Sequence, residues 1–286
     1  SSLPGLAPPS ELRAANGLFD STIRIAQAGG PFLAATIMAV LPAIHLLTAN
    51  AVSFLASAGA VFAVGRRLDQ SKPTAVGPKP GFLRRLARGI HAANATPGVW
   101  GALITTAVRG GSYALGFTVA VPLLFAQGEG SAGLAGVAIT ELLASAFVVL
   151  TDPKRPLRRQ FEGYTAIGVA QTLVGAAALL DGPLRIPAMV TAALVMGAAH
   201  SVAGLQMLNF FSTRLSTDDY AAVLRLRLVM VIGAMMGSTA LGPFVLPVLG
   251  PAMTGVVCGL IATATAVIGL FSRPARTLGR GFQPLD

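Results

Sequence analysis

The sequence predicts an all-α integral membrane protein, and three observations lead to this prediction. Hydrophobic residues make up 53% of the 286 positions. Charged residues make up 11%, against about 25% in an average soluble domain. The apolar residues gather into eight stretches, each near the ~20 residues that a helix needs to cross ~30 Å of hydrocarbon. The cations then fall almost wholly on one side of the membrane that these stretches define.

Eight spans follow one another along the chain, mostly as hairpins with short connections. They cover Ala14–Val40, Pro42–Val64, Gly98–Phe125, Ser131–Leu150, Gly163–Leu180, Pro187–Phe211, Ala221–Phe244 and Val248–Phe271. Turn signals stand between the third and fourth spans (Gly128-Glu-Gly) and between the fifth and sixth (Asp181-Gly-Pro). A lipid bilayer is therefore the expected surrounding of this chain.

The cations orient the spans. Eighteen of the 21 Lys and Arg residues lie before the first span, after the last, or around the connections that follow the second, fourth and sixth. The opposite connections hold only Arg185, while Arg24 and Arg109 lie inside spans. By the positive-inside rule, both ends of the chain and the long 65–97 connection are predicted to be cytoplasmic.

Several function classes are disfavoured. The net charge of +10 does not indicate a nucleic-acid partner, because the cations are confined to short loops without an aromatic-rich basic motif. The lone Cys258 builds no disulfide framework. A P-loop, a His-Glu-x-x-His motif and a Ser-His-Asp arrangement are all lacking. We therefore expect no enzyme activity, no cofactor and no metal site.

A Pro- and Gly-rich connection at 65–97 separates two groups of spans. Apolar residues at positions 82, 83, 86, 87 and 90 have helical spacing with a basic opposite face, which predicts a short amphipathic helix on the membrane surface. The expected organisation is 1–64 as two helices of an N-terminal bundle, 65–97 as linker, 98–272 as a C-terminal six-helix bundle and 273–286 as a cytoplasmic tail.

A weak internal repeat connects the first two spans with the last two. In each pair a glycine-rich helix carrying Gly-Pro, at Gly30-Pro31 and at Gly242-Pro243, is followed by a helix ending in arginine. Parallel repeats of helix groups are a common construction of secondary transporters. The repeat predicts partners for spans three to six ahead of Ser1, so we expect eight helices of a twelve-helix architecture. A self-contained eight-helix protein is the alternative.

Residues of the first span resemble the antiporter motif of the fifth helix of major facilitator superfamily exporters. Gly17, Gly30 and Pro31 match the pattern G-x8-G-x3-G-P-x2-G-G, in which three other glycines are alanine here. Further stretches resemble the drug- and siderophore-efflux branch, including enterobactin exporters. These are Arg13-Ala-Ala-Asn-Gly-Leu, Thr22-Ile-Arg24, Ala49-Asn-Ala-Val-Ser-Phe54, Ala95-Thr-Pro97 and the spacing of Ser216-Thr-Asp-Asp219.

The resemblance implies a major facilitator fold in a bacterial cytoplasmic membrane. It implies proton-coupled export of a small molecule, a siderophore or similar amphipathic anionic metabolite, by alternating access. A multidrug or macrolide-type exporter, a siderophore importer and a truncated non-transporting membrane component remain alternatives. The missing first four helices would be a partner on the same or another chain. The loop with Asp152, Arg155 and Arg159 resembles an Asp/Arg motif that latches helix ends; a simple basic loop is the alternative.

Ionisable groups within hydrocarbon are expensive and are therefore functional candidates. Arg109 lies roughly 16 Å into its span and Glu141 lies at comparable depth in the next. The two could form a buried ion pair, or Glu141 could exchange a proton as Arg109 meets an anionic substrate. The expected substrate-binding residues are Arg24, Arg109, Tyr113, Gln206 and Asn209, and the expected proton-coupling residues are Glu141 and His200. An i,i+4 pair of Arg24 with Asp20 and a merely packed His200 are the alternatives.

Overall fold

The computed structural model describes residues 81–126, 155–180 and 182–277, together with Thr22 and most of 52–63. Within the three long ranges every element is a helix. In chain order they are α3 (Phe82–Ala95), α4 (Val99–Tyr113), the π-helix η2 (Ala114–Val119), α5 (Ala120–Ala126), α7 (Pro156–Ala177), α8 (Arg185–Arg214), α9 (Thr217–Phe271) and α10 (Arg273–Thr277). Apart from Thr22, the predicted spans Ala14–Val40 and Ser131–Leu150 lie outside the described residues.

Three described segments are long and apolar enough to cross a membrane: Val99–Leu124, Arg185–Arg214 and Thr217–Phe271. They coincide with the third, sixth and last two predicted spans. Helix α7 covers most of the predicted span Gly163–Leu180 but begins seven residues earlier, so charged groups such as Arg158 and Glu162 lie in its first turns. The all-helical class is confirmed. The eight spans of a facilitator fold stay a prediction.

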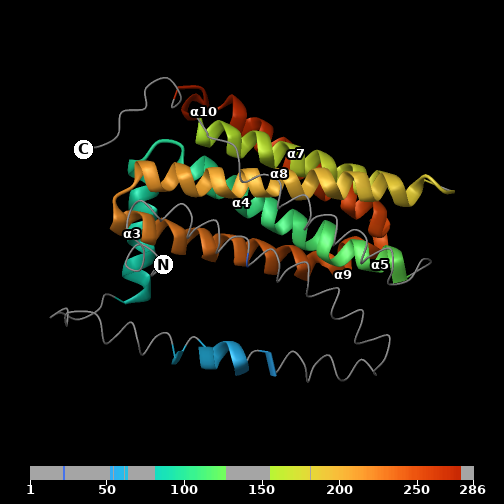
Figure 1. The fold of residues 1–286 in the computed structure, drawn as a ribbon, viewed down its shortest axis with the longest axis horizontal. Coiled ribbons are helices and arrows are strands. Elements are labelled where there is room, and N and C mark those ends of the chain that lie inside the picture. The colour runs from blue at the N-terminus through green and yellow to red at the C-terminus, as the bar shows by residue number, and fades with distance from the viewer. Residues whose placement is uncertain are drawn as a thin grey trace.

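Helix α9 consists of two arms that meet at Gly250. This residue has φ 72° and ψ 165°, a conformation essentially confined to glycine. Figure 1 shows one arm running from the end near α3 to the far end of the bundle and the other returning to α10. The first arm continues through Pro243 and Pro247 rather than ending at Phe244 as predicted. The predicted pair of spans is therefore one hairpin whose reversal lies further along the chain.

The helices of the three long described ranges form one bundle (Figure 1). Helix α7 packs against α8 and α9, and α4 packs mainly against α9. A buried core joins η2 and α5 with α7 and α8, and it includes Phe117, Val121, Tyr164 and Met196. The α4–η2–α5 segment and α8 are thereby brought into one structural unit, although the chain between them is long.

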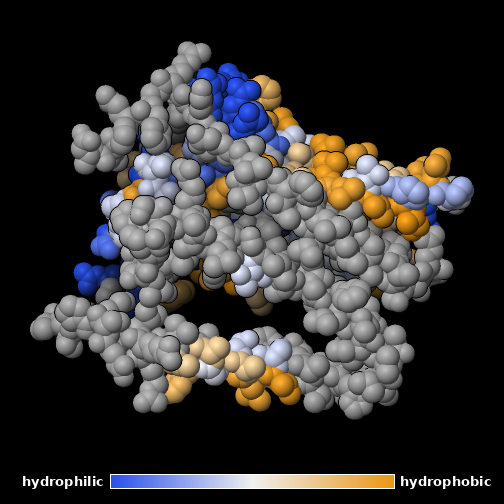
Figure 2. Space-filling view, viewed as in Figure 1, coloured by the Kyte–Doolittle hydropathy of each residue, from blue (hydrophilic) through white to orange (hydrophobic). Residues whose placement is uncertain are grey.

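A second core closes one end of the bundle. Residues near the starts of α4, α7 and α9 and the end of α8 pack together there with α3 and α10. Gly98 has φ 91°, and a Cβ at this position would lie 2.7 Å from Leu157 and 3.2 Å from Pro274. These are the helix ends that the cation pattern places on a common side. Figure 2 shows hydrophilic residues gathered at this end, where α7 begins and α10 lies.

Glycines bring α7 into backbone contact with the second arm of α9. A Cβ at Gly168 would lie 2.6 Å from the amide nitrogen of Thr263, and one at Gly259 would lie 2.5 Å from that of Thr172. Gly255 and Gly259 form a G-x3-G pair, the spacing that allows close approach of helices in membranes. We call Gly168, Gly175, Gly255 and Gly259 the glycine seam.

Helix α3 lies across the end of the bundle where α9 begins (Figure 1). Gly89, Ala92 and Ala93 are its buried residues, and a Cβ at Gly89 would lie 2.7 Å from the carbonyl oxygen of Ala222. Phe82 and Leu83 are exposed among the described residues. The predicted helix is therefore present, and small residues dock it against α9. Its contact with a membrane surface stays a prediction.

Candidate functional site

Arg109 and His200 meet near the middle of the apolar segments Val99–Leu124 and Arg185–Arg214. Arg109 Nη2 lies 2.9 Å from His200 Nδ1. Arg109 is ten residues beyond the start of α4, or about 15 Å at the α-helical rise. His200 is fifteen residues beyond the start of the 30-residue α8, or about 22 Å along it. Two groups predicted separately as mid-span candidates thus form one contact.

This contact determines the proton arrangement of the imidazole. A guanidinium carries only donors, so His200 Nδ1 must accept the hydrogen bond. An imidazole that accepts at Nδ1 is neutral and carries its proton on Nε2. Protonation of His200 would turn Nδ1 into a donor and place a second positive charge beside Arg109. The geometry therefore makes the Arg109 contact sensitive to the charge of His200.

Aromatic rings extend the site along α4 and η2. The guanidinium carbon of Arg109 lies 4.7 Å from the ring centroid of Tyr113, within cation–π range. Tyr113 stacks on Phe117 with centroids 5.0 Å apart and an interplanar angle of 20°. The ring of His200 meets Tyr113 edge-on at 6.3 Å. We call Arg109, Tyr113, Phe117 and His200 the cationic–aromatic cluster. Phe117 was not predicted from the sequence.

Gln206 and Asn209 lie away from this cluster. At 100° per residue, they are rotated by about 240° and 180° from His200 around α8, so they project from other faces of the helix. Gln206 is buried, and its Oε1 has no hydrogen-bond partner among the described residues. Asn209 is half-buried, and its backbone carbonyl accepts bonds from Ser212 and Thr213. The structure therefore does not bring these two predicted residues to the cationic–aromatic cluster.

Several predicted site residues cannot be placed. Arg24, Glu141, Gly17, Gly30, Pro31 and Asp152 lie outside the described residues. Arg155 is the residue before α7, and its carbonyl oxygen accepts a bond from the amide of Arg159. Arg159 also pairs with Glu162 on its own helix at 3.0 Å. The latching role of the loop around Asp152 therefore stays a prediction.

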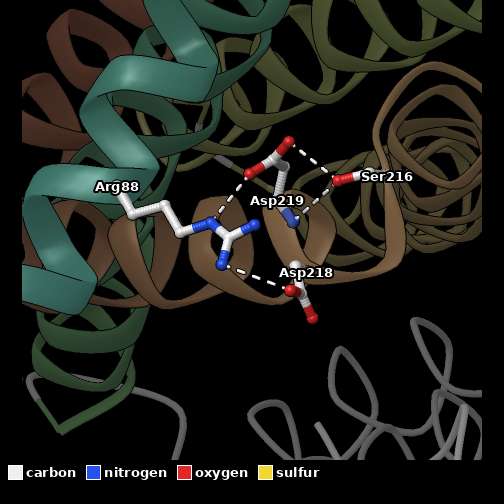
Figure 3. A network of polar contacts seen from close by, with 4 residues as sticks. All are labelled: Arg88, Ser216, Asp218 and Asp219. Atoms are coloured by element: carbon white, nitrogen blue, oxygen red, sulfur yellow. Dashed lines mark hydrogen bonds and ion pairs between the residues drawn. The ribbon is translucent and has the colours of Figure 1, made fainter. Parts of the chain in front are cut away.

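Sequence reasoning missed a charged contact between α3 and the start of α9 (Figure 3). Arg88 Nε donates to Asp219 Oδ1 at 2.9 Å, and Arg88 Nη1 donates to Asp218 Oδ2 at 3.2 Å. Ser216 caps α9: its hydroxyl accepts from the amide of Asp219 and donates to the carboxylate of Asp219 at 2.7 Å. We call these four residues the linker latch.

Ser216, Asp218 and Asp219 of the linker latch lie at the polar start of α9, ahead of the apolar sequence that begins at Ala221, while Arg88 lies on α3. Hydrogen bonds from Ser216 and then from Arg88 hold the pKa of Asp219 below its usual range. The hydrogen bond to Asp219 likewise raises the pKa of Arg88. The resemblance had marked Ser216 and Asp219 as a pattern. Only the fold could supply Arg88, because 131 residues separate it from Asp219.

The described residues contain no group of three or more His, Cys, Asp or Glu side chains that could hold a metal ion. Comparison with protein-family models, with curated proteins and with solved structures finds no match for this chain. Any function must therefore be argued from the site itself.

Proposed function

We propose that this chain is part of a secondary active membrane transporter of the major facilitator type. It would export a siderophore or similar amphipathic anionic metabolite across a bacterial cytoplasmic membrane, coupled to protons, by alternating access. The cationic–aromatic cluster supports this proposal because it lies midway along two apolar helices, where transporters of this kind bind substrate. The resemblance of the first span to an antiporter motif supports the export direction.

One observation carries the proposal: a guanidinium lies at mid-helix depth against an aromatic ring and an imidazole. Arginine in a membrane segment is costly, so its presence favours a functional role. A guanidinium presents donors in a fixed fork that matches a carboxylate. The Tyr113–Phe117 stack supplies an apolar surface for the ring of such an anion. An aryl anion therefore fits the chemistry of the cluster.

The neutral state of His200 favours a second candidate function, proton-linked import of the same anion. Protonation would add a positive charge beside Arg109, so a proton and an anion would promote one another's binding at this site. Joint binding of proton and substrate is the requirement for symport, whereas antiport needs competition between them. Competition would arise if protonation of His200, which turns Nδ1 into a donor, broke the hydrogen bond to Arg109 and moved the guanidinium away from the anion.

Transport assays test the proposal. We expect membrane vesicles containing the chain to move a catecholate siderophore only when a proton gradient is present. Arg109→Ala should reduce anion transport by about tenfold to a hundredfold, because a hydrogen bond to a charged group contributes about 1.5–3 kcal/mol. Transport of a neutral drug should be spared. Equal loss of anion and neutral-drug transport would contradict the assigned role of Arg109.

The coupling is tested by the pH dependence of anion affinity. Antiport predicts weaker anion binding as the pH falls, whereas symport predicts tighter binding. Arg109→Lys is the matched control, because it keeps the charge and removes the planar fork. Retained transport in this variant would show that charge alone suffices. Vesicles that move neither anions nor neutral drugs under any gradient would refute the transporter proposal.

A further inference from the structure

The helix that carries Arg109 changes its hydrogen-bond pattern directly after Tyr113. Residues Ala114–Val119 form the π-helix η2, which begins one residue beyond Tyr113 and contains Phe117. π-helical residues are well under 1% of protein residues and often occur at functional sites. The π turn thus separates the Arg109 end of the segment from the half that begins at Ala120.

Both sides of η2 are held by packing. On the Arg109 side, a Cβ at Gly111 would lie 3.0 Å from the carbonyl oxygen of Ala234 in α9. Phe117 within η2 and Val121 beyond it are buried in the core with α7 and α8. Changing a π turn into an α turn would rotate one side relative to the other by about 100°, the rotation of one residue. The π turn therefore sets the rotation of Tyr113 relative to Phe117.

Gln171 of α7 reaches the backbone at this point. Its side chain is 1% exposed, and its Nε2 donates to the carbonyl oxygen of Ser112 at 2.9 Å. The residue that faces this amide is Gly116, where a Cβ would lie 2.5 Å from both Gln171 Nε2 and Cys258 Cβ. The π segment therefore packs directly against the side-chain amide of Gln171. This amide holds the carbonyl group of Ser112, the residue before Tyr113.

We propose that Gln171 is a positioning residue for the cationic–aromatic cluster. Its hydrogen bond to the Ser112 carbonyl holds the π turn, which keeps Tyr113 against Phe117 and beneath the guanidinium of Arg109. Gln171 acts through the backbone of the segment and not by contact with a substrate. The assignment rests on the proposed function where it concerns anion binding, and on geometry alone where it concerns the arrangement of Arg109 and His200.

Gln160 offers a matched control. It also lies on α7, is 0% exposed, and donates through Nε2 to a backbone carbonyl of α4, that of Ala102, at 3.3 Å. The bond of Gln160 reaches α4 near its start, away from η2. Both glutamines have a buried Oε1 without a hydrogen-bond partner among the described residues. Gln160 Nε2 also lies 3.4 Å from the hydroxyl oxygen of Thr106. Gln171→Leu and Gln160→Leu therefore each remove a buried amide bond from α7 to an α4 carbonyl, at different places, and Gln160→Leu removes the longer bond to Thr106 as well.

Three measurements on the detergent-solubilised chain test the proposal. The ring signal of His200 is followed by NMR of ¹³C-labelled histidine at pH 7 and assigned with His200→Asn, since the chain has three histidines. The dissociation constant of 2,3-dihydroxybenzoate, a simple aryl anion, is measured by calorimetry. Stability is measured by unfolding in sodium dodecyl sulfate.

We expect Gln171→Leu to move the His200 signal and to weaken binding of the probe by tenfold or more, whereas Gln160→Leu lowers stability and leaves both unchanged. In Gln171→Glu we expect an unchanged His200 signal and normal probe binding at pH 5, where a protonated carboxyl can donate to the Ser112 carbonyl. At pH 8 the ionised carboxylate cannot donate, so both should change as in Gln171→Leu. Equal effects of the two leucine variants, or an unmoved His200 signal in both Gln171 variants, would overturn the assignment.

Failure of the proposed function is distinguishable from failure of this assignment. If the unaltered chain does not bind the aryl anion, the proposed function loses its support, but the His200 signal still decides whether Gln171 orders the cluster. If Gln171→Leu does not fold, Gln171→Glu at the two pH values gives the same decision without removing the side chain.

Discussion

The glycine seam predicts that one added methyl group separates two helices. In Gly259→Ala the new Cβ would lie 2.5 Å from the amide nitrogen of Thr172 and 2.8 Å from the carbonyl oxygen of Gly168. These atoms belong to the backbone and cannot turn aside. The helices would have to separate by about 0.9 Å to bring the closer backbone contact to 3.4 Å, where ordinary van der Waals contact begins.

The cost of that separation can be placed within limits. A gap of 0.5–1 Å forfeits about a quarter to a half of each contact's dispersion energy, and overpacking a well-packed core costs about 1–3 kcal/mol. Replacing glycine by alanine in a helix otherwise gains up to about 1 kcal/mol. The matched control is Gly233→Ala in the first arm of α9, because the described residues place no atom within 4 Å of its added Cβ.

Unfolding in sodium dodecyl sulfate measures the difference, with the fluorescence of Trp100 as reporter because the chain has a single tryptophan. We expect Gly259→Ala to lower the free energy of unfolding by about 1–3 kcal/mol and Gly233→Ala to leave it unchanged or raise it by up to about 1 kcal/mol. If Gly259→Ala is as stable as Gly233→Ala, the close approach of α7 and α9 is refuted.

Two further predictions concern the linker latch. Ser216→Ala should lower the free energy of unfolding by about 0.5–2 kcal/mol, measured in the same titration, because it removes the N-cap of α9. Arg88→Gln should speed amide hydrogen exchange in α3, and salt should reduce the difference between the variant and the unaltered chain. Because the pKa of Asp219 is lowered, its contribution is present at neutral pH and is lost only as the pH falls below about 4. Unchanged exchange in Arg88→Gln, or a loss of protection already at pH 6, would contradict this account.

Much of the described fold follows from hydrophobic periodicity. The span predicted at Gly98–Phe125 coincides closely with the observed Val99–Leu124, because its composition is uniform and a Gly precedes it. The amphipathic spacing at 82–90 correctly predicted α3. The end of the first α9 arm was harder to predict, since Pro243 and Pro247 indicate a break in water but are accommodated within membrane helices.

The candidate site could be predicted only in part. Depth along a helix can be counted from the sequence, and it marked Arg109 and His200 as mid-span groups. Which helix faces meet depends on helix rotation, which the sequence does not give, so the contact of Arg109 with His200, 91 residues away, was not predicted. The suggested pairing of Arg109 with Glu141, which lies outside the described residues, stays a prediction. The sequence did not indicate the π turn at Ala114–Val119, in which Gly116 lies so close to Gln171 and Cys258 of other helices that an added Cβ would be 2.5 Å from each.

The reversal at Gly250 restricts how the bundle can rearrange. A single residue joins two long rods, so neither rod can slide lengthwise past the other without unwinding a turn next to that point. The glycine seam further ties the returning rod to α7. Any rearrangement of the bundle would therefore carry α7 and both arms of α9 together as one body.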